Sequence, residues 1–143
     1  MLNLTQHPAT PAQIEAGVVE PASAIKAKIV KLLNFEGILT PAEIAGRAAK
    51  LAAIAAESGA KTAMIGGALC LMGAGALYLM GALENALRER GVHHLYAFSI
   101  RESVEAVQPD GSVVKTTVLK HGGFASLNLI EHASLMDKAN LPW

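Results

Sequence analysis

The sequence predicts a single α/β domain, a small Rossmann-like open sheet that is mostly parallel and ends in a β-hairpin. Short apolar segments suited to buried strands alternate with longer segments of helical spacing, which is the order of parallel strands joined by helical crossovers. Near the end, two segments of strand character flank Pro109, Asp110 and Gly111, a strong signal for a hairpin turn. At 143 residues, the chain is long enough to bury a core.

Three short apolar segments are the predicted parallel strands, because each is bounded by Gly, Pro, charged or polar turn residues. They are residues 2–6, 62–65 and 95–100. The carboxyl ends of parallel strands meet at one edge of a sheet, where ligands bind in open α/β folds. Residues 5–10, 66–68 and 99–103 are therefore expected at that edge.

Two similar phrases predict helix starts. TPAQ at 10–13 and TPAE at 40–43 each place Thr as N-cap, Pro at the first helical position and Gln or Glu at the third, which is a capping box. The second phrase opens a helix over residues 41–58, with Gly59 as its C-cap. A further helix is predicted over residues 22–33.

Residues 67–82 read GALCLMGAGALYLMGA, an eight-residue phrase written twice with Cys70 exchanged for Tyr78. They lie in an uncharged run long enough to cross a bilayer. Glycines dilute its hydrophobicity, and basic residues flank both sides without a clear bias, so the pattern favours a strand, a turn at Gly66 and Gly67, and one long helix. The repeat is then a duplication that lengthens this helix. A membrane or assembly protein that uses the repeat is the alternative.

Charge and cysteine content bound the partners and the compartment. Twelve basic residues balance twelve acidic ones, so no strong field attracts duplex nucleic acid or anionic lipid. The single Cys70 cannot form an internal disulfide, and the first residues, MLNLTQHPAT, lack the pattern of a signal peptide. A cytoplasmic protein is expected, and a membrane partner is not.

The sequence lacks several catalytic signatures. It has no phosphate-binding G-x-x-x-x-G-K-[ST] loop, no H-E-x-x-H pair, no cysteine pair and no G-x-S-x-G elbow. His93 and His94 precede a predicted strand, where solvated loop histidines are more common than metal ligands. No metal or other cofactor is expected.

Polar groups at the predicted strand ends are the candidate site. They are Gln6 and His7 after the first strand, Gly66 and Gly67 after the second, Ser99, Arg101 and Ser103 leaving the third, and Lys120 and His121 at the end of the hairpin. Glycines let a ligand approach the backbone, and a guanidinium can clamp a phosphodiester. Structural readings stay open beside these: a loop anchor for His7, a tight turn for the glycines, a surface ion pair of Arg101 with Glu105, and a solvated edge for Lys120 and His121.

These segments resemble the small CARF-like (CRISPR-associated Rossmann fold) proteins of type III CRISPR loci, which bind or cleave cyclic oligoadenylate messengers. The similar segments are LTQHPATPAQ after the first strand, AMIGGA after the second, and YAFSIRESVEAVQPDGSVVKTTVLKHGGF at the end. The order of elements extends the likeness over residues 1–124. Residues 125–143 depart from the family pattern and are expected to form an appended tail or short helix, and the eight-residue duplication departs from it too.

The resemblance implies a homodimer or higher homo-oligomer whose strand ends form a pocket for a symmetric ring of adenylates. Family members that cleave the ring need no metal, because they hold a ribose 2′-OH in line with its own phosphodiester. By this resemblance Arg101 would contact phosphate and Ser99 would lie near the ribose as the catalytic residues. Ligand-binding residues would be Gln6, His7, Gly66, Gly67, Ser103, Lys120 and His121. The implied function is a ring nuclease of antiviral CRISPR signalling, and the alternative is a non-catalytic sponge for the same messenger.

Overall fold

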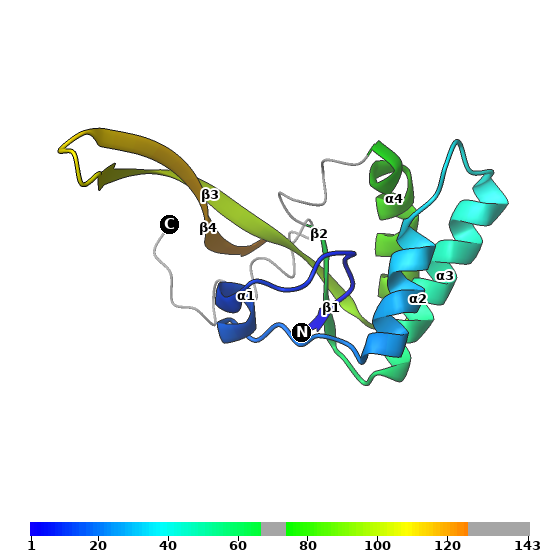
Figure 1. Ribbon diagram of the computed structural model, residues 1–143. Helices are drawn as coiled ribbons and strands as arrows, with labels where there is room; N and C mark the ends of the chain where they lie inside the picture. Colours follow the sequence, from blue (N-terminus) through cyan, green and yellow to red (C-terminus); the bar gives the residue numbers. More distant parts are fainter. Residues whose placement is uncertain (67–73, 126–143) are drawn as a thin grey trace.

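The computed structural model describes residues 1–66 and 74–125, which form one sheet and its covering helices (Figure 1). In chain order the elements are β1 (Leu2–Asn3), α1 (Pro11–Glu15), α2 (Ser23–Leu33), α3 (Pro41–Glu57), β2 (Thr62–Gly66), α4 (Ala74–Glu89), β3 (His93–Val107) and β4 (Val113–Ala125). Over these residues the strand order is β1-β2-β3-β4, parallel from β1 to β3 and antiparallel between β3 and β4. The protein therefore has a mixed α/β fold, consistent with a Rossmann-like open sheet.

The helix boundaries follow the predicted caps. Thr10 and Thr40 each accept a hydrogen bond from the backbone N–H three residues on, and the side chains of Gln13 and Glu43 accept one in return from the threonine N–H. Both predicted capping boxes are confirmed. α3 ends at Glu57 because Gly59 takes the left-handed conformation, at a φ of 76°.

The helices α2, α3 and α4 lie on one face of the sheet (Figure 1). Neighbouring parallel strands follow one another in sequence, so right-handed crossovers place their helices on the same side. The main core lies between these layers and contains Leu4, Ile29, Leu51, Ile65 and Leu83. A smaller cluster on the opposite face joins Val18, Met64 and Ala97, with Ala9 and Phe124 packed against it.

The first strand is shorter than predicted. The expected strand over residues 2–6 ends at Asn3, because the Asn3 side chain accepts a hydrogen bond from the Thr5 N–H at 3.0 Å and the chain turns there. Leu4 still donates its N–H to the Met64 carbonyl at 2.9 Å. The turn starts the loop that carries Gln6 and His7.

The third strand is much longer than predicted. We expected a strand over residues 95–100 followed by a loop at 99–103, but β3 continues without interruption to Val107 and pairs with β4 along that length. This corrects the expectation that Ser99, Arg101 and Ser103 leave the strand together. Residues 98–107 and 113–121, the hairpin arm, extend away from the helices (Figure 1).

The turn of the arm is confirmed where it was predicted. Gln108 donates its N–H to the Ser112 carbonyl at 2.7 Å, and Gly111 has a φ of 84° that suits glycine. The Asp110 carboxylate accepts hydrogen bonds from the N–H and the hydroxyl of Ser112, which lower the pKa of Asp110. These contacts fix the register of the arm.

The eight-residue repeat is described only in its second half. α4 begins at Ala74 and contains the second copy, whereas residues 67–73, with Gly67 and Cys70, lie outside the described residues, as do residues 126–143. Within the part of the chain that the structure describes, no helix has the length and apolarity needed to cross a membrane.

Candidate functional site

The loop after β1 is held by the side chain of Asn3, which is fully buried. Its Oδ1 accepts hydrogen bonds from the N–H and the hydroxyl of Thr5, at 3.0 and 2.7 Å. Its Nδ2 donates to the carbonyl of His7 at 2.8 Å and to the carboxylate of Glu20. A single buried amide therefore ties the loop after β1 to the segment that follows α1.

Glu20 and Lys26 complete this network from the segment after α1 and from α2. Lys26 Nζ donates to the His7 carbonyl at 2.9 Å and lies 3.3 Å from a Glu20 oxygen. Partial burial raises the pKa of Glu20, but hydrogen bonds from Asn3 and Ala9 and the charge of Lys26 outweigh it, so the pKa is lowered. The loop is thus preformed around an ionised carboxylate.

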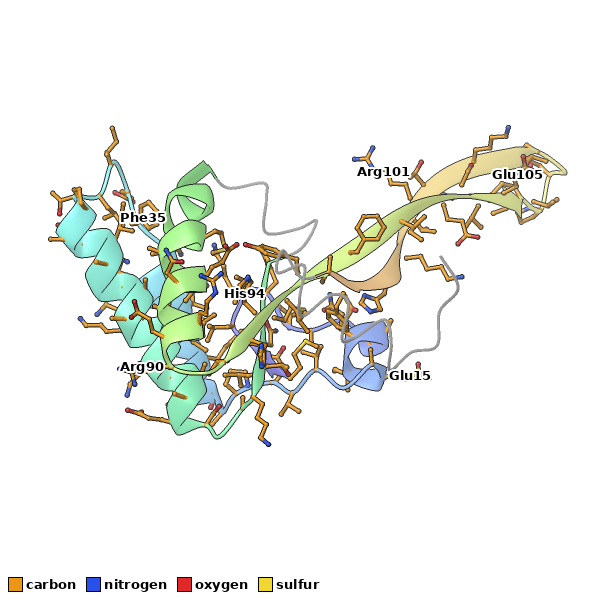
Figure 2. The ribbon with its side chains drawn as sticks, turned by 180° about the vertical axis from the view of Figure 1, so that it is seen from behind. Glu15, Phe35, Arg90, His94, Arg101 and Glu105 are labelled. Atoms are coloured by element: carbon orange, nitrogen blue, oxygen red, sulfur yellow. The ribbon has the colours of Figure 1, made fainter. Side chains whose placement is uncertain are left out.

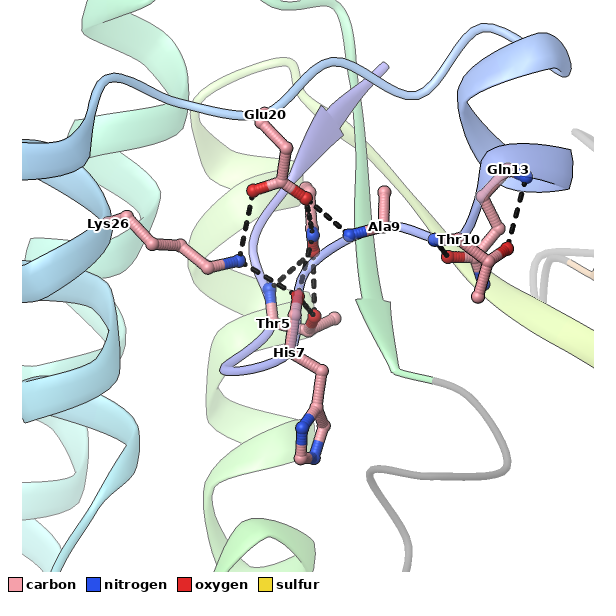
Figure 3. A network of polar contacts seen from close by, with 8 residues as sticks. Thr5, His7, Ala9, Thr10, Gln13, Glu20 and Lys26 are labelled. Carbon is pink, nitrogen blue, oxygen red and sulfur yellow. Dashed lines mark hydrogen bonds and ion pairs between the residues drawn. The ribbon is translucent and has the colours of Figure 1, made fainter.

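The two groups of His7 have separate roles. Its backbone carbonyl anchors the loop, which confirms the structural reading of this position. Its imidazole is exposed and points away from the network (Figure 3). That ring remains accessible to a ligand.

The end of β2 is covered by an aromatic side chain. Gly66 is buried, and a Cβ at this position would lie 2.9 Å from Cδ1 of Tyr96. Tyr96 donates its hydroxyl hydrogen to the carboxylate of Glu84 on α4, and burial, together with that carboxylate, raises the pKa of the phenol. The expected turn at Gly66 is wrong, because Gly66 is the last residue of β2, where the missing side chain makes room for the Tyr96 ring.

His121 lies opposite Ser99 in the antiparallel register, at the base of the arm. Its ring contacts the Phe124 ring, with centroids 4.8 Å apart. Its Nδ1 is buried and has no hydrogen-bond partner among the described residues. His121 is half-buried, so the predicted solvated edge is wrong for this residue.

The small cluster on the sheet's second face connects His121 to the loop after β1. Phe124, which contacts His121, packs against the same cluster as Ala9, two residues after His7. The structure therefore brings the loop after β1 and the end of β4 together on the face opposite α2, α3 and α4. Phe124 was not predicted as a site residue, although it closes the last segment that resembles CARF-like proteins.

Arg101 and Ser103 share a face of the arm with His121, because residues alternate along a strand and direct cross-strand partners point the same way. Arg101 is exposed (Figure 2). The alternative of a surface ion pair between Arg101 and Glu105 is wrong, because the Glu105 carboxylate lies 3.5 Å from the Lys115 ammonium group instead. Arg101 is two residues beyond Ser99, roughly 7 Å along the arm, so one ligand can reach both Arg101 and His121.

Lys120 is separated from this set. It lies on the opposite face of the arm, and its Nζ is 4.0 Å from the Glu102 carboxylate. It is exposed, as the solvated-edge reading predicted. The structure therefore does not bring Lys120 together with His121 and Arg101.

Metal binding finds no support in the described residues, which hold no cluster of three or more His, Cys, Asp or Glu side chains suited to a metal ion. The expectation that His93 and His94 lie in a loop is wrong, because both belong to β3. His93 is exposed as expected, whereas His94 is only 2% exposed. His94 Nε2 is buried and has no hydrogen-bond partner in the described parts of the chain.

A separate groove of about 520 Å³ lies between α2 and α3. It is lined by Lys28, Lys31, Leu32, Arg47, Lys50, Ala53, Ile54 and Glu57, none of which was predicted as a site residue. Its arginine is already engaged, because Arg47 Nη1 donates to three carbonyls at the end of α2 and its guanidinium stacks on Phe35. The remaining lysines make this groove a rival location for an anion.

Comparison with known proteins gives a family and no function. A family model described as the Uncharacterized protein MJ1673 family matches residues 1–125, so the chain belongs to this family. No curated protein and no solved structure matches the chain significantly. The matched region contains the whole hairpin arm and every residue of the candidate site.

Proposed function

We propose that this member of the MJ1673 family is a CARF-like protein that binds a cyclic oligoadenylate. The proposed binding site lies where the loop after β1 meets the base of the hairpin arm. The observation that carries the proposal is the His121–Phe124 ring pair with its buried, unpartnered Nδ1. A buried polar atom without a partner is costly, and a ligand hydrogen bond would remove that cost. The proposed compartment is the cytoplasm.

Aromatic rings beside an accessible cation suit an adenine nucleotide. Phe124 and His121 offer ring faces for stacking, and His121 Nδ1 offers a hydrogen bond to a base or ribose. The exposed imidazole of His7 extends from a loop that the Asn3 network holds in place. Little ordering of this loop is then needed on binding.

Arg101 is the proposed phosphate contact. It is exposed and has no salt-bridge partner among the described residues, so binding a phosphate breaks no existing ion pair. A ring of nucleotides is large enough to touch His121 and Arg101 together, as their spacing along the arm requires. A ring of identical units also suits two identical half-sites, so the proposed binding unit is a homodimer.

Cleavage is proposed as metal-independent attack within the ring. The ribose 2′-oxygen attacks its neighbouring phosphorus, the bond to the next 5′-oxygen breaks, and the proton of the 2′-OH ends on that 5′-oxygen. The products are a 2′,3′-cyclic phosphate and a 5′-hydroxyl. Arg101 would stabilise the charge that develops on the phosphoryl oxygens, and the backbone position of Ser99 opposite His121 is compatible with a contact to the ribose. A sponge would perform the binding step alone.

The test is binding and mass analysis with cyclic tri-, tetra- and hexa-adenylate and the pure full-length protein. We expect one ring size to bind, and Arg101→Ala to bind at least about tenfold more weakly because a charge-assisted hydrogen bond is lost. Recovery of linear products indicates a ring nuclease, and recovery of the intact ring after heat release indicates a sponge.

Two matched variants locate the site. Lys115→Ala removes a cation from the same face of the arm, nearer its tip, and is expected to leave affinity unchanged. Lys50→Ala removes a cation from the groove between α2 and α3. Loss of binding in Lys50→Ala with normal binding in Arg101→Ala would move the site to that groove, and no binding of any ring would refute the proposed function.

A further inference from the structure

The hairpin arm exposes large apolar side chains although it is only two strands wide. Phe98 is 57% exposed and Ile100 51%, and similar fractions hold for Val104, Val114 and Val118. A two-stranded hairpin is marginally stable in water on its own. These exposed side chains are therefore unusual for a hairpin behind which the described residues form no second layer.

The register gathers these five residues on one side, whereas the exposed Val107 and Val113 lie on the opposite face beside the turn. Phe98, Ile100 and Val104 alternate with polar residues along β3, and Val114 and Val118 are on the same side of β4. We call these five residues the apolar face of the arm. Gly122 lies beneath its base, where an added Cβ would be 3.0 Å from both Phe98 and Ile100, so these two side chains lie side by side over the glycine. The opposite face carries Arg101, Ser103 and His121.

The apolar face also carries one charge of each sign near its middle. Glu102 and Lys120 belong to this face and lie 4.0 Å apart. A surface with balanced charge among apolar side chains does not suit nucleic acid or an anionic membrane, because both need net positive charge. Such a surface is complementary to a second copy of itself related by a two-fold axis, because opposite charges can then meet across the interface.

We propose that the apolar face of the hairpin arm is covered by the apolar face of a second copy of this chain. In a two-fold arrangement each Glu102 meets the Lys120 of the other copy, and valines pack on valines between two ribbons about 10 Å apart. The opposite face of each arm, with Arg101 and His121, then points away from the partner, so this contact is a different one from the pairing of two half-sites around a ring. The inference concerns the interface alone and holds whatever ligand the protein takes.

The rival cover is the chain's own residues 126–143, which follow β4 directly. The second copy is favoured because the family model includes the whole arm and stops at residue 125. The apolar face lies within the residues that the family model matches, and we expect the residues that cover it, those of a second copy, to lie within the same matched range.

The interface is small. The arm has nine residue pairs, from Ser99–His121 to Val107–Val113, and is therefore about 30 Å long. One ribbon face of this length is at the lower end of the sizes found in specific interfaces. The dimer is expected to dissociate on dilution, within the micromolar range.

The experiment is sedimentation velocity on the full chain over a range of concentrations, with a charge swap on the apolar face. Glu102→Lys places two like charges on each face and is expected to shift dissociation to a concentration at least about tenfold higher. Glu102→Lys combined with Lys120→Glu restores complementary charges and is expected to restore the dimer. Glu105→Lys breaks the ion pair on the opposite face and serves as the matched control, with no shift expected.

Circular dichroism of each variant reports whether the fold is retained, and Val104→Glu provides a second route to the same loss. A dimer that survives both Glu102→Lys and Val104→Glu would overturn the proposal, because another surface would then hold it. A full chain that is monomeric throughout, and that associates only when residues 126–143 are removed, would overturn it in favour of the tail. No ligand is present, so failure here is distinguishable from failure of the proposed function.

Discussion

The ring of Tyr96 lies so close to Gly66 that a Cβ on the glycine would be 2.9 Å from Cδ1 of the tyrosine. The two residues are partners in the parallel register of β2 and β3, at the last position of β2. Tyr96 is held on its other side by its hydrogen bond to Glu84. The end of β2 is thereby locked to β3 and α4 at the edge of the sheet that carries the candidate site.

Gly66→Ala is expected to destabilise the protein. The added methyl group must displace a ring anchored to α4, and overpacking of this kind costs about 1–3 kcal/mol in the free energy of unfolding. Urea unfolding followed by circular dichroism measures it. Gly46→Ala, in α3 with open space around the position, is the control and should be neutral or slightly stabilising. Equal stability of Gly66→Ala and the parent would contradict the packing described here.

Tyr96→Phe removes only the hydroxyl that donates to Glu84. We expect a loss of about 1 kcal/mol, because the half-buried carboxylate loses its partner but stays within reach of water. The pKa of Tyr96 is raised, so this contribution is present below the ordinary tyrosine pKa of 10.0 and is lost as the pH rises through the folded value. The difference in urea midpoint between variant and parent should therefore be complete at pH 8 and shrink above about pH 10, as the pH rises toward the folded value. A constant difference would exclude the hydrogen bond as the cause.

The sequence predicted those elements whose signals are local. Thr40 and Glu43 specify a helix start through contacts within four residues, and Gly111 marks a turn by its own conformational freedom. The order of strands and helices follows from the same signals. The mixed α/β fold could therefore be inferred without any long-range information.

The length of β3 could not be predicted in the same way. Residues 99–103 read as polar and charged, which is typical of a loop, but their backbone groups are satisfied by pairing with β4. That pairing depends on the cross-strand partner and on a register shift between Phe98 and Ser99. The sequence of β3 alone therefore does not show where the strand ends, because pairing with β4 stabilises its second half.

The sequence predicted residues of the candidate site but not the contacts that hold them in place. His7, Arg101 and His121 were identified, yet the groups that hold the loop after β1 were not, because Asn3, Glu20 and Lys26 come from separate segments. The sequence signal for this network was Asn3, a polar residue between Leu2 and Leu4 in a predicted buried strand. The ion pair of Arg101 with Glu105, left open as an alternative, does not form, and spacing along the sequence could not show that Lys115 lies opposite Glu105.

Thr40→Ala and Thr10→Ala test whether the contribution of a capping box to the free energy of unfolding depends on how much of its helix is buried. Thr40 caps α3, which has buried residues along its length, whereas Thr10 caps α1, which has none. We expect Thr40→Ala to lower the free energy of unfolding by about 1 kcal/mol. Thr10→Ala should leave global unfolding nearly unchanged, because α1 can fray without opening the core. Hydrogen exchange of the α1 amides would report that fraying, and equal global effects of the two substitutions would contradict this account.

Glu20→Gln tests the ionised carboxylate in the loop after β1. The pKa of Glu20 is lowered below its ordinary value of 4.5, so its contribution to stability is present above that pH and is lost as the pH falls through the folded value. The parent should therefore be more stable than Glu20→Gln at pH 7, and the difference should shrink as the pH falls below 4.5. Urea midpoints measured from pH 7 downward provide the comparison.

The difference between the two proteins isolates Glu20 from other acid-sensitive groups. Hydrogen bonds from Thr40 lower the pKa of Glu43, and those from Ser112 lower the pKa of Asp110, so both also favour loss of stability in acid. Because Glu43 and Asp110 are present in both proteins, their effects cancel in the difference. Parallel curves at all pH values would show that the carboxylate charge does not stabilise the loop. The preformed position of His7 would then rest on the hydrogen bonds that its carbonyl accepts from Asn3, Thr5 and Lys26.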